Sequence, residues 1–405
     1  MRIPNILYQV KLYFLVFALA GFGLISFVPD IMGVDARVLT ISYRASIFLI
    51  SALLILFALA NLKGRLIVKF TSLLSILLIT AYLFRLSGDA QFNFGRSLSE
   101  IMIIAIGVSF IPAIAFSTLK NNKIILKASN ILIVCFVLIA FLAVFNGLIK
   151  GYDYRLSGNS VLNPITLGHF AASGIILITI KWLTLRGVRV SYMDKMWLMS
   201  SLLILFTALF MAGSRGPVLA LFLTLGYYLS SRFIHILRKK LFGVIAILTL
   251  IIIVVNSFEQ VFTLFSNRMI IDIGDGQEGG EARVLLWING VKIFLQYPFF
   301  GNQTTTLMGY PHNIMIEILM STGVVGGIAF LMIIAHAIKK VHLLNKSHSM
   351  LIWPGLLFFQ HLTGSLFSGT LYSSNDLWYS LALLLAVNLN HLPIIFENRK
   401  KTNEC

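Results

Sequence analysis

Residues 131–145 read ILIVCFVLIAFLAVF, a run without a single charged side chain. Runs of the same kind occur at residues 12–28 (LYFLVFALAGFGLISFV) and 241–255 (LFGVIAILTLIIIVV). The chain of 405 residues is 58% hydrophobic and 12% charged, with a mean hydropathy of +0.90. A soluble domain carries about twice that charged fraction. Because the lipid interior requires each crossing to satisfy its own backbone hydrogen bonds, the runs predict an all-α integral membrane protein.

About twelve segments are long and apolar enough to cross a bilayer, which takes roughly 18 to 20 residues. The first follows Met1-Arg2 and Lys11 as a signal peptide would, but its long apolar core and the lack of a small-residue cleavage site predict a retained anchor. With Cys135 inside a predicted span and Cys405 at the last position, no structural disulfide is expected. The predicted spans are residues 11–29, 43–61, 66–84, 99–117, 124–148, 163–183, 196–213, 216–234, 240–257, 312–337, 350–370 and 375–393.

The formal net charge is +17, and the basic residues behind it are distributed unevenly between the two sides of the predicted membrane. With the N-terminus inside, 22 of the 32 lysines and arginines lie in predicted cytoplasmic segments, as the positive-inside rule requires. This distribution explains the basic balance by membrane topology, so nucleic acid is not an expected partner.

The ten outward-facing basic residues differ in type from those inside. Eight are arginines and two are lysines, whereas the inner set holds 15 lysines and 7 arginines. Arginine presents a planar fork that binds phosphate or carboxylate through two parallel hydrogen bonds. The outer face is therefore predicted to hold an anion, although any single arginine there could equally contact lipid headgroups. The ten are Arg37, Arg44, Arg85, Arg96, Lys150, Arg155, Arg215, Arg268, Arg283 and Lys292.

The longest polar stretch, residues 257–311, is predicted to form a large external loop over a single transmembrane domain that spans residues 1–405. Within it, apolar residues from Val284 to Leu295 recur at helical spacing and end before Pro298. We expect an amphipathic helix with Arg283 near its start. It would either cover a site or only anchor the loop at the membrane surface.

Two outer turns carry candidate anion- or sugar-binding groups. GSRGP (213–217) places Arg215 at the start of a helix, where backbone amides would help to hold phosphate oxygens. RLSGNSVLNP (155–164) carries Arg155 and Asn163, whose side chains suit phosphate and sugar hydroxyls. Both segments are also ordinary turn sequences.

The polar residues at the start of the tenth span form a third candidate. In PHNIMIE (311–317), His312 and Asn313 lie at the outer end and Glu317 a little over one turn deeper. A neutral imidazole there could take a proton from an incoming hydroxyl, or it could be an interfacial aromatic ring. Nothing in the local sequence favours the competing His169, His361 or His391.

Four segments together resemble the O-antigen polymerase and ligase superfamily of bacterial envelope glycosyltransferases. They are RLSGNSVLNPITLG (155–168), GSRGPVLAL (213–221), EARVLLWINGVKIFLQYPFFG (281–301) and PHNIMIEILMSTGVVGGIAF (311–330). The resemblance implies a GT-C-like polytopic fold with one large periplasmic loop, both termini in the cytoplasm, and a periplasmic site at the bacterial inner membrane.

The resemblance also implies a chemistry. An inverting, metal-independent transfer without a cofactor would use an oligosaccharide linked to undecaprenyl pyrophosphate. Arg215 and Arg283 would clamp the pyrophosphate, His312 would act as the base, and Arg155 would contact the donor glycan or the phosphates. Asn163, Asn313 and Glu317 complete the candidate substrate-binding set. Membrane lipids, a chain-length regulator and a flippase are the further partners expected.

Three classes of function remain open on the sequence: an enzyme (polymerase or ligase), a transporter and a scaffold. The proline before the His-Asn pair and the compact GSRGP turn resemble polymerases more than ligases, which differ from them chiefly in acceptor. A lipid-linked oligosaccharide flippase or transporter would place ionisable groups near the bilayer midplane, whereas nearly all charges here lie at predicted span ends. A structural scaffold would not need arginine in place of lysine outside. The outward arginines therefore favour an enzyme.

Overall fold

The structure is a computed structural model that describes residues 3–61, 70–89, 97–151, 155–184, 191–230, 280–347 and 349–389. Within these ranges the chain is helical, without a β-strand, apart from one isolated bridge between Thr306 and Gly309. The all-α prediction is therefore confirmed.

The helices occur in the order in which the apolar runs predict them. Residues 215–230 are also helical. The labelled helices are α1 (Ile3–Ile25), α2 (Val28–Met32), α3 (Ala36–Ala60), α4 (Phe70–Gly88), α5 (Leu98–Ile103), the π-helix η1 (Ile104–Phe110), α6 (Ile111–Ser117), α7 (Asn122–Lys150), α8 (Pro164–Thr184), α9 (Tyr192–Met211), α12 (Gly280–Gln296), α13 (Ile314–Lys346), the 3₁₀ turn η2 (Met350–Ile352), α14 (Trp353–Ser368) and α15 (Asn375–Ala386).

Eight helical segments in the described ranges are long and apolar enough to cross a membrane. They are Asn5–Ile25, Ala36–Ala60, Leu98–Ser117, Asn122–Lys150, Pro164–Thr184, Tyr192–Met211, Ile314–Lys346 and Met350–Ser368. The predicted span 240–257 and residues 257–279 of the predicted loop lie outside the described residues, as do parts of the spans 66–84, 216–234 and 375–393. The total of twelve therefore stays a prediction, while the polytopic class is confirmed.

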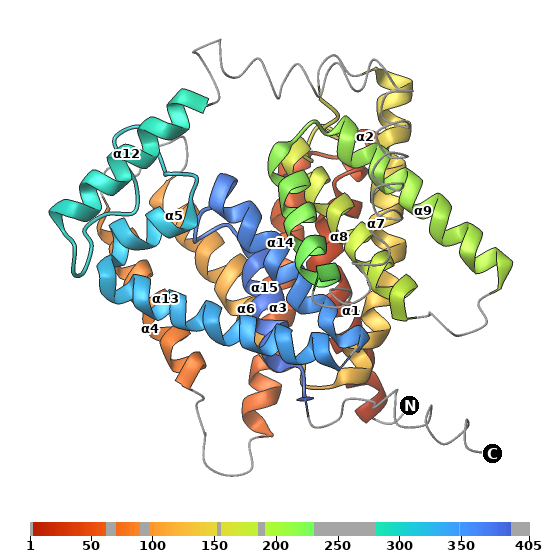
Figure 1. Ribbon diagram of the computed structural model, residues 1–405, viewed down its shortest axis with the longest axis horizontal. Helices are drawn as coiled ribbons and strands as arrows, with labels where there is room; N and C mark the ends of the chain where they lie inside the picture. Colours follow the sequence, from red (N-terminus) through yellow and green to blue (C-terminus); the bar gives the residue numbers. More distant parts are fainter. Residues whose placement is uncertain are drawn as a thin grey trace.

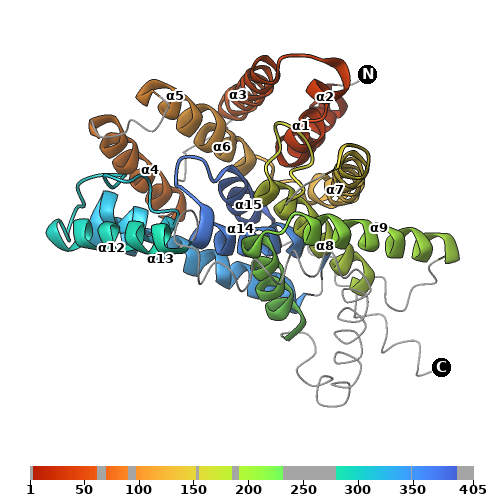
Figure 2. The ribbon, with the colours of Figure 1, turned by 90° about the horizontal axis from the view of Figure 1, so that it is seen from above.

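The helices pack side by side around one hydrophobic core (Figures 1 and 2). On one side α7 packs against α1, α8 and α9; on the other, α13 packs against α4 and α12. The pair α14 and α15 packs between them, with α15 against α6 and α14 against α8. In Figure 1, α12 lies at the upper left, at the end of the bundle opposite to the start of α1. A helix, α12, is present where an amphipathic helix was expected, and its place in an outer loop stays a prediction.

Helix α13 is interrupted at Gly323, where the backbone has φ 64° and ψ −162°. The segment that follows α12 runs against this break. Val324 and Val325 donate their backbone N–H groups to the carbonyl oxygens of Pro298 (2.8 Å) and Phe299 (3.3 Å). On the other side of the break, the N–H of Asn302 donates to the Met320 carbonyl at 2.8 Å. Backbone from YPFFG thus replaces hydrogen bonds that a continuous helix would make within itself.

A buried carboxylate holds the next part of this segment. Oδ2 of Asp89, just after α4, accepts hydrogen bonds from the N–H and Oγ1 groups of Thr304 (2.9 and 2.8 Å). It also accepts from the N–H and Oγ1 groups of Thr305, both at 3.2 Å. Four donors satisfy a carboxylate that is otherwise expensive to bury. The chain between α12 and α13 is therefore tied to both α4 and α13, which positions the residues before Asn313.

Candidate active site

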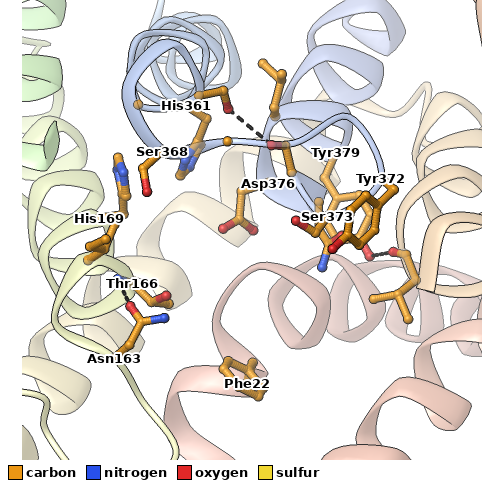
Figure 3. A pocket seen from close by; sticks show the side chains of 18 of the residues that line it. Phe22, Asn163, Thr166, His169, His361, Ser368, Tyr372, Ser373, Asp376 and Tyr379 are labelled. Atoms are coloured by element: carbon orange, nitrogen blue, oxygen red, sulfur yellow. Dashed lines mark hydrogen bonds between the residues drawn. The ribbon is translucent and has the colours of Figure 1, made fainter. Parts of the chain in front are cut away.

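A cavity of about 780 Å³ opens among α1, α3, α8, α12, α14 and α15. His312 and Tyr310, from the loop before α13, lie on its wall together with Arg283 of α12. Asn163, at the start of α8, also lines it. Figure 3 shows the part of the cavity between α8, α14 and α15, with the Asp376 carboxylate pointing into the open centre. Three of the predicted site residues, His312, Arg283 and Asn163, therefore share one cavity.

His312 has an unusual backbone. Its φ of 53° is the only positive φ of a non-glycine residue in the described ranges. Side chains disfavour this left-handed region, and such strained residues cluster at functional sites. The imidazole packs on Tyr310 with ring centroids 4.1 Å apart. Its Nδ1 is buried and, within the described part of the chain, has no hydrogen-bond partner. The ring is held by packing on Tyr310, and Nδ1 is not engaged by any group in the described ranges.

The surroundings of His312 favour its neutral form. Burial lowers the pKa of its imidazole below the ordinary value, and the nearby positive charge of Arg283 lowers this pKa further. Arg283 itself is exposed and donates from Nη1 to the Phe367 carbonyl oxygen at 3.4 Å, near the C-terminus of α14. A neutral imidazole and a guanidinium thus lie on the same wall, which suits proton acceptance beside an anion.

Both predicted asparagines act as helix caps. Oδ1 of Asn313 accepts from the N–H groups of Met315 (3.0 Å) and Ile316 (3.2 Å) at the start of α13. Oδ1 of Asn163 accepts from the Thr166 N–H at 2.8 Å, at the start of α8. Asn313 therefore fixes the point at which α13 begins and, with it, the position of His312. Asn163 does the same for α8 while lining the cavity.

Arg155 and Arg215 belong to a different place, the turn between α9 and the helical residues 215–230. The guanidinium of Arg155 donates to the carbonyl oxygens of Ala212 (3.3 Å, from Nε) and Gly213 (3.2 Å, from Nη2). These carbonyls end α9, so Arg155 caps a helix C-terminus. The next helix starts at Arg215, as predicted, and Arg215 is exposed. Neither arginine is among the residues that line the cavity in this structure.

Glu317 is buried in a closed hydrogen-bond network, 1% exposed, and does not line the cavity. Oε1 accepts from the Tyr82 hydroxyl at 2.7 Å, and Oε2 accepts from the Leu371 N–H at 2.8 Å. The residue after Leu371, Tyr372, is part of the cavity wall. Glu317 therefore connects α13 to α4 and to the loop between α14 and α15, and the geometry favours a positioning role over the predicted contact with substrate.

Two substitutions at Glu317 separate these roles. Glu317→Ala leaves a buried hydroxyl and a buried N–H without partners, each at a cost of about 1–3 kcal/mol, so thermal stability in detergent should fall. Glu317→Gln can still accept from Leu371 and donate to the Tyr82 oxygen, and should retain most stability and activity. An inactive but fully stable Glu317→Gln protein would instead show that the carboxylate acts on substrate.

The cavity also contains polar residues outside the predicted set of site residues. His169 of α8 and His361 of α14 lie with ring centroids 5.5 Å apart, and Asp376 of α15 and Arg44 of α3 share the lining. A Cβ at Gly364 would lie 2.5 Å from Cε1 of His169, so only glycine leaves room for this ring. The two histidines lie inside predicted apolar spans, and a polar residue in such a span is a signal that the sequence does offer. Their meeting in one cavity depends on how α8, α14 and α15 pack.

The fold and the cavity define a polytopic helical membrane protein with an arginine- and histidine-lined site at the start of α13. Residues 200–331 match the model of a family described as O-antigen ligase. The match covers about a third of the chain, includes Arg215, Arg283 and His312, and confirms the resemblance to the O-antigen polymerase and ligase superfamily. The description of this family is that of an enzyme. No match was found among curated proteins.

Proposed function

We propose that this chain is an O-antigen or related surface-polysaccharide polymerase of the bacterial inner membrane. It would join oligosaccharide repeat units carried on undecaprenyl pyrophosphate, at the periplasmic face, by inverting and metal-independent transfer. The observation that carries the proposal is the pairing of Arg283 with His312, a strained and half-buried histidine, on one cavity wall. This pairing supplies an anion-binding group and a proton acceptor in a single site.

In the proposed reaction, the acceptor hydroxyl oxygen attacks the anomeric carbon of the donor sugar. The bond between this carbon and the pyrophosphate oxygen breaks, and the electron pair leaves with the pyrophosphate. His312 takes the proton of the hydroxyl, and the Arg283 guanidinium stabilises the negative charge on the leaving group. Attack from the face opposite to the leaving group inverts the anomeric configuration.

Arg215 remains the second proposed pyrophosphate ligand. It starts a helix at residue 215 and is exposed. A helix N-terminus favours an anion through its free N–H groups and its dipole. Arg155 supports this position indirectly, because it binds the carbonyls of the turn that precedes Arg215. Its proposed contribution is thus to hold this turn.

The second candidate function is ligation of the lipid-linked glycan to lipid A core, which the description of the matching family favours. The lipopolysaccharide banding pattern of a strain lacking this chain tests both functions. Core that carries one repeat, with the ladder lost, would establish the polymerase. Core without any repeat, with polymerised lipid-linked glycan accumulating, would establish the ligase. A ladder that is the same with and without this chain would contradict both functions.

The pH dependence of transfer tests the pairing of Arg283 with His312. A base works only when neutral, so the rate should fall as the pH drops through the lowered pKa of His312. Arg283→Gln removes a positive charge that lowers this pKa. The acid limb of kcat/KM should therefore move to higher pH, in addition to any loss of maximal rate. An acid limb at the wild-type position would show that Arg283 does not act on the titrating group.

A further inference from the structure

A group of polar side chains lines the cavity without a role in the reaction proposed above. We call His361, Ser368 and Asp376 the inner polar group. Figure 3 shows the three side chains around the same open space, between α14 and α15. All three line the cavity. No hydrogen bond or ion pair within the described ranges engages the Asp376 carboxylate, the His361 ring or the Ser368 hydroxyl.

Polar groups in such a position are costly unless a ligand or water satisfies them. The three side chains therefore indicate the hydrogen-bonding character of what the cavity binds. An ionised carboxylate only accepts hydrogen bonds, whereas imidazole and hydroxyl groups can both donate and accept. A ligand that fits must present donors to Asp376 and groups of either kind to His361 and Ser368.

Sugar hydroxyls meet this requirement and phosphate does not. A hydroxyl can donate to an oxygen of the Asp376 carboxyl group, while the oxygens of a pyrophosphate ester at neutral pH carry no proton to donate. Among the residues that the structure describes, no three His, Cys, Asp or Glu side chains come together as ligands of a metal ion. Phe22 and Tyr372 add aromatic surface to the same cavity. The inner polar group is thus suited to a neutral, hydroxyl-rich ligand.

Hydrogen bonds from α13, α15 and the π-helix η1 hold the part of the cavity wall at Leu371 and Tyr372. The Leu371 N–H donates to Glu317, the Trp378 indole donates to the Leu371 carbonyl at 2.8 Å, and the Ser109 hydroxyl donates to the Tyr372 carbonyl at 2.6 Å. Ser109 belongs to the π-helix η1, and the Tyr379 hydroxyl of α15 donates to the Val108 carbonyl there. A π-helix within an α-helix often accompanies a functional site.

His169 is also fixed beside the group. The Gln360 side-chain amide donates to the His169 carbonyl at 2.8 Å, and the Ser173 hydroxyl donates to Oε1 of Gln360 at 2.9 Å. These bonds join α8 to α14 at Gln360, the residue before His361. Backbone that is fixed before the ligand arrives does not have to be ordered on binding, which favours specific recognition.

We propose that the inner polar group is a saccharide subsite that binds hydroxyl groups of the donor or acceptor glycan, in the same cavity as the pyrophosphate site at Arg283. The proposal rests on the proposed function, because it assumes a glycan substrate. It assigns Asp376 the central contact, because the two oxygens of its carboxyl group can bind two hydroxyl groups at once.

Binding of two probes to the purified full chain in detergent tests the subsite. The first probe is the oligosaccharide obtained by partial acid hydrolysis of the host strain's surface polysaccharide. The second is farnesyl pyrophosphate, which carries the anion but no sugar. Asp376→Asn should weaken oligosaccharide binding about tenfold or more, since each lost charged hydrogen bond has roughly that effect, and should leave farnesyl pyrophosphate binding unchanged. Arg283→Gln should do the reverse.

Asp194→Asn is the matched control, because Asp194 is an exposed carboxylate in the first turn of α9. It should bind both probes as the wild type does. Equal oligosaccharide affinity of Asp376→Asn and wild type would overturn the subsite, and so would loss of both probes, which would make Asp376 a structural residue. A wild-type chain that binds no oligosaccharide would contradict the proposed function itself.

Transfer assays with Asp376→Asn show whether the subsite binds the donor glycan or the acceptor glycan. The substrate whose KM rises is the one that the subsite binds. A higher KM for the lipid-linked donor in Asp376→Asn would assign the subsite to the donor glycan. A higher KM for the acceptor would assign it to the acceptor. Either result supports the proposal, whereas a lower kcat with both KM values unchanged would contradict it.

Discussion

His312→Ala is expected to lower the rate of glycosyl transfer by a factor of about 10² to 10⁴, the usual contribution of a general base. The substitution removes the only side chain at the start of α13 that combines a cavity position, a lowered pKa and an unpaired Nδ1 within the described ranges. The measurement is the initial rate of transfer by purified protein, together with the lipopolysaccharide ladder of a complemented strain. Protein abundance in the membrane should not change.

His342→Ala is the matched control on the same helix, because His342 is exposed near the opposite end of α13. It should transfer at the wild-type rate. Alanine keeps the Cβ and with it the backbone strain at residue 312, while the half-buried imidazole has no hydrogen bond from Nδ1 to lose, so a large loss of stability should not accompany the loss of rate. Normal transfer by a well-folded His312→Ala protein would exclude His312 from the mechanism.

Gly323→Ala is expected to prevent correct folding of the outer part of α13. The backbone of Gly323, at φ 64° and ψ −162°, lies in a region that is essentially restricted to glycine. A Cβ there would also lie 2.3 Å from the carbonyl carbon and oxygen of Phe299 and 2.5 Å from the Phe300 nitrogen. Strain alone costs about 1–3 kcal/mol, and the backbone contact cannot relax without separating the two segments. The thermal unfolding midpoint in detergent should drop sharply.

Gly226→Ala provides the comparison for this effect. Gly226 lies in the helical residues 215–230, and a Cβ there would meet nothing within 4 Å. Alanine should be neutral or slightly stabilising at this position, because glycine is the poorer helix former by about 1 kcal/mol. Equal midpoints for the two variants would show that the segment after α12 does not depend on its contact with the break in α13.

The sequence by itself determined the class of the protein and most of its local structure. Apolar runs such as residues 131–145 are sufficient for transmembrane helices, because lipid leaves the backbone no other way to satisfy its hydrogen bonds. The spacing of apolar residues after Arg283 predicted α12, and the GSRGP turn predicted the helix that starts at Arg215. These features depend on neighbours within a few residues, which is why they can be read locally.

The candidate site was only partly accessible in this way. His312, Arg283 and Asn163 were predicted to act together and do share the cavity. Arg155, Asn313 and Glu317 carry the same residue types, yet their side chains are engaged in a helix C-terminus, a helix N-terminus and a buried network. A residue type shows which bonds a side chain can make. Which bonds it does make depends on the partners that the fold brings within reach.

Only the tertiary structure decided the remaining features. It brought His169, His361 and Asp376 from α8, α14 and α15 into one cavity, and it supplied the Pro298 and Phe299 carbonyls that allow α13 to break at Gly323. These contacts join residues that are far apart in the chain or in different helices. Their geometry follows from the packing of whole helices, whose relative positions no local pattern of residues specifies.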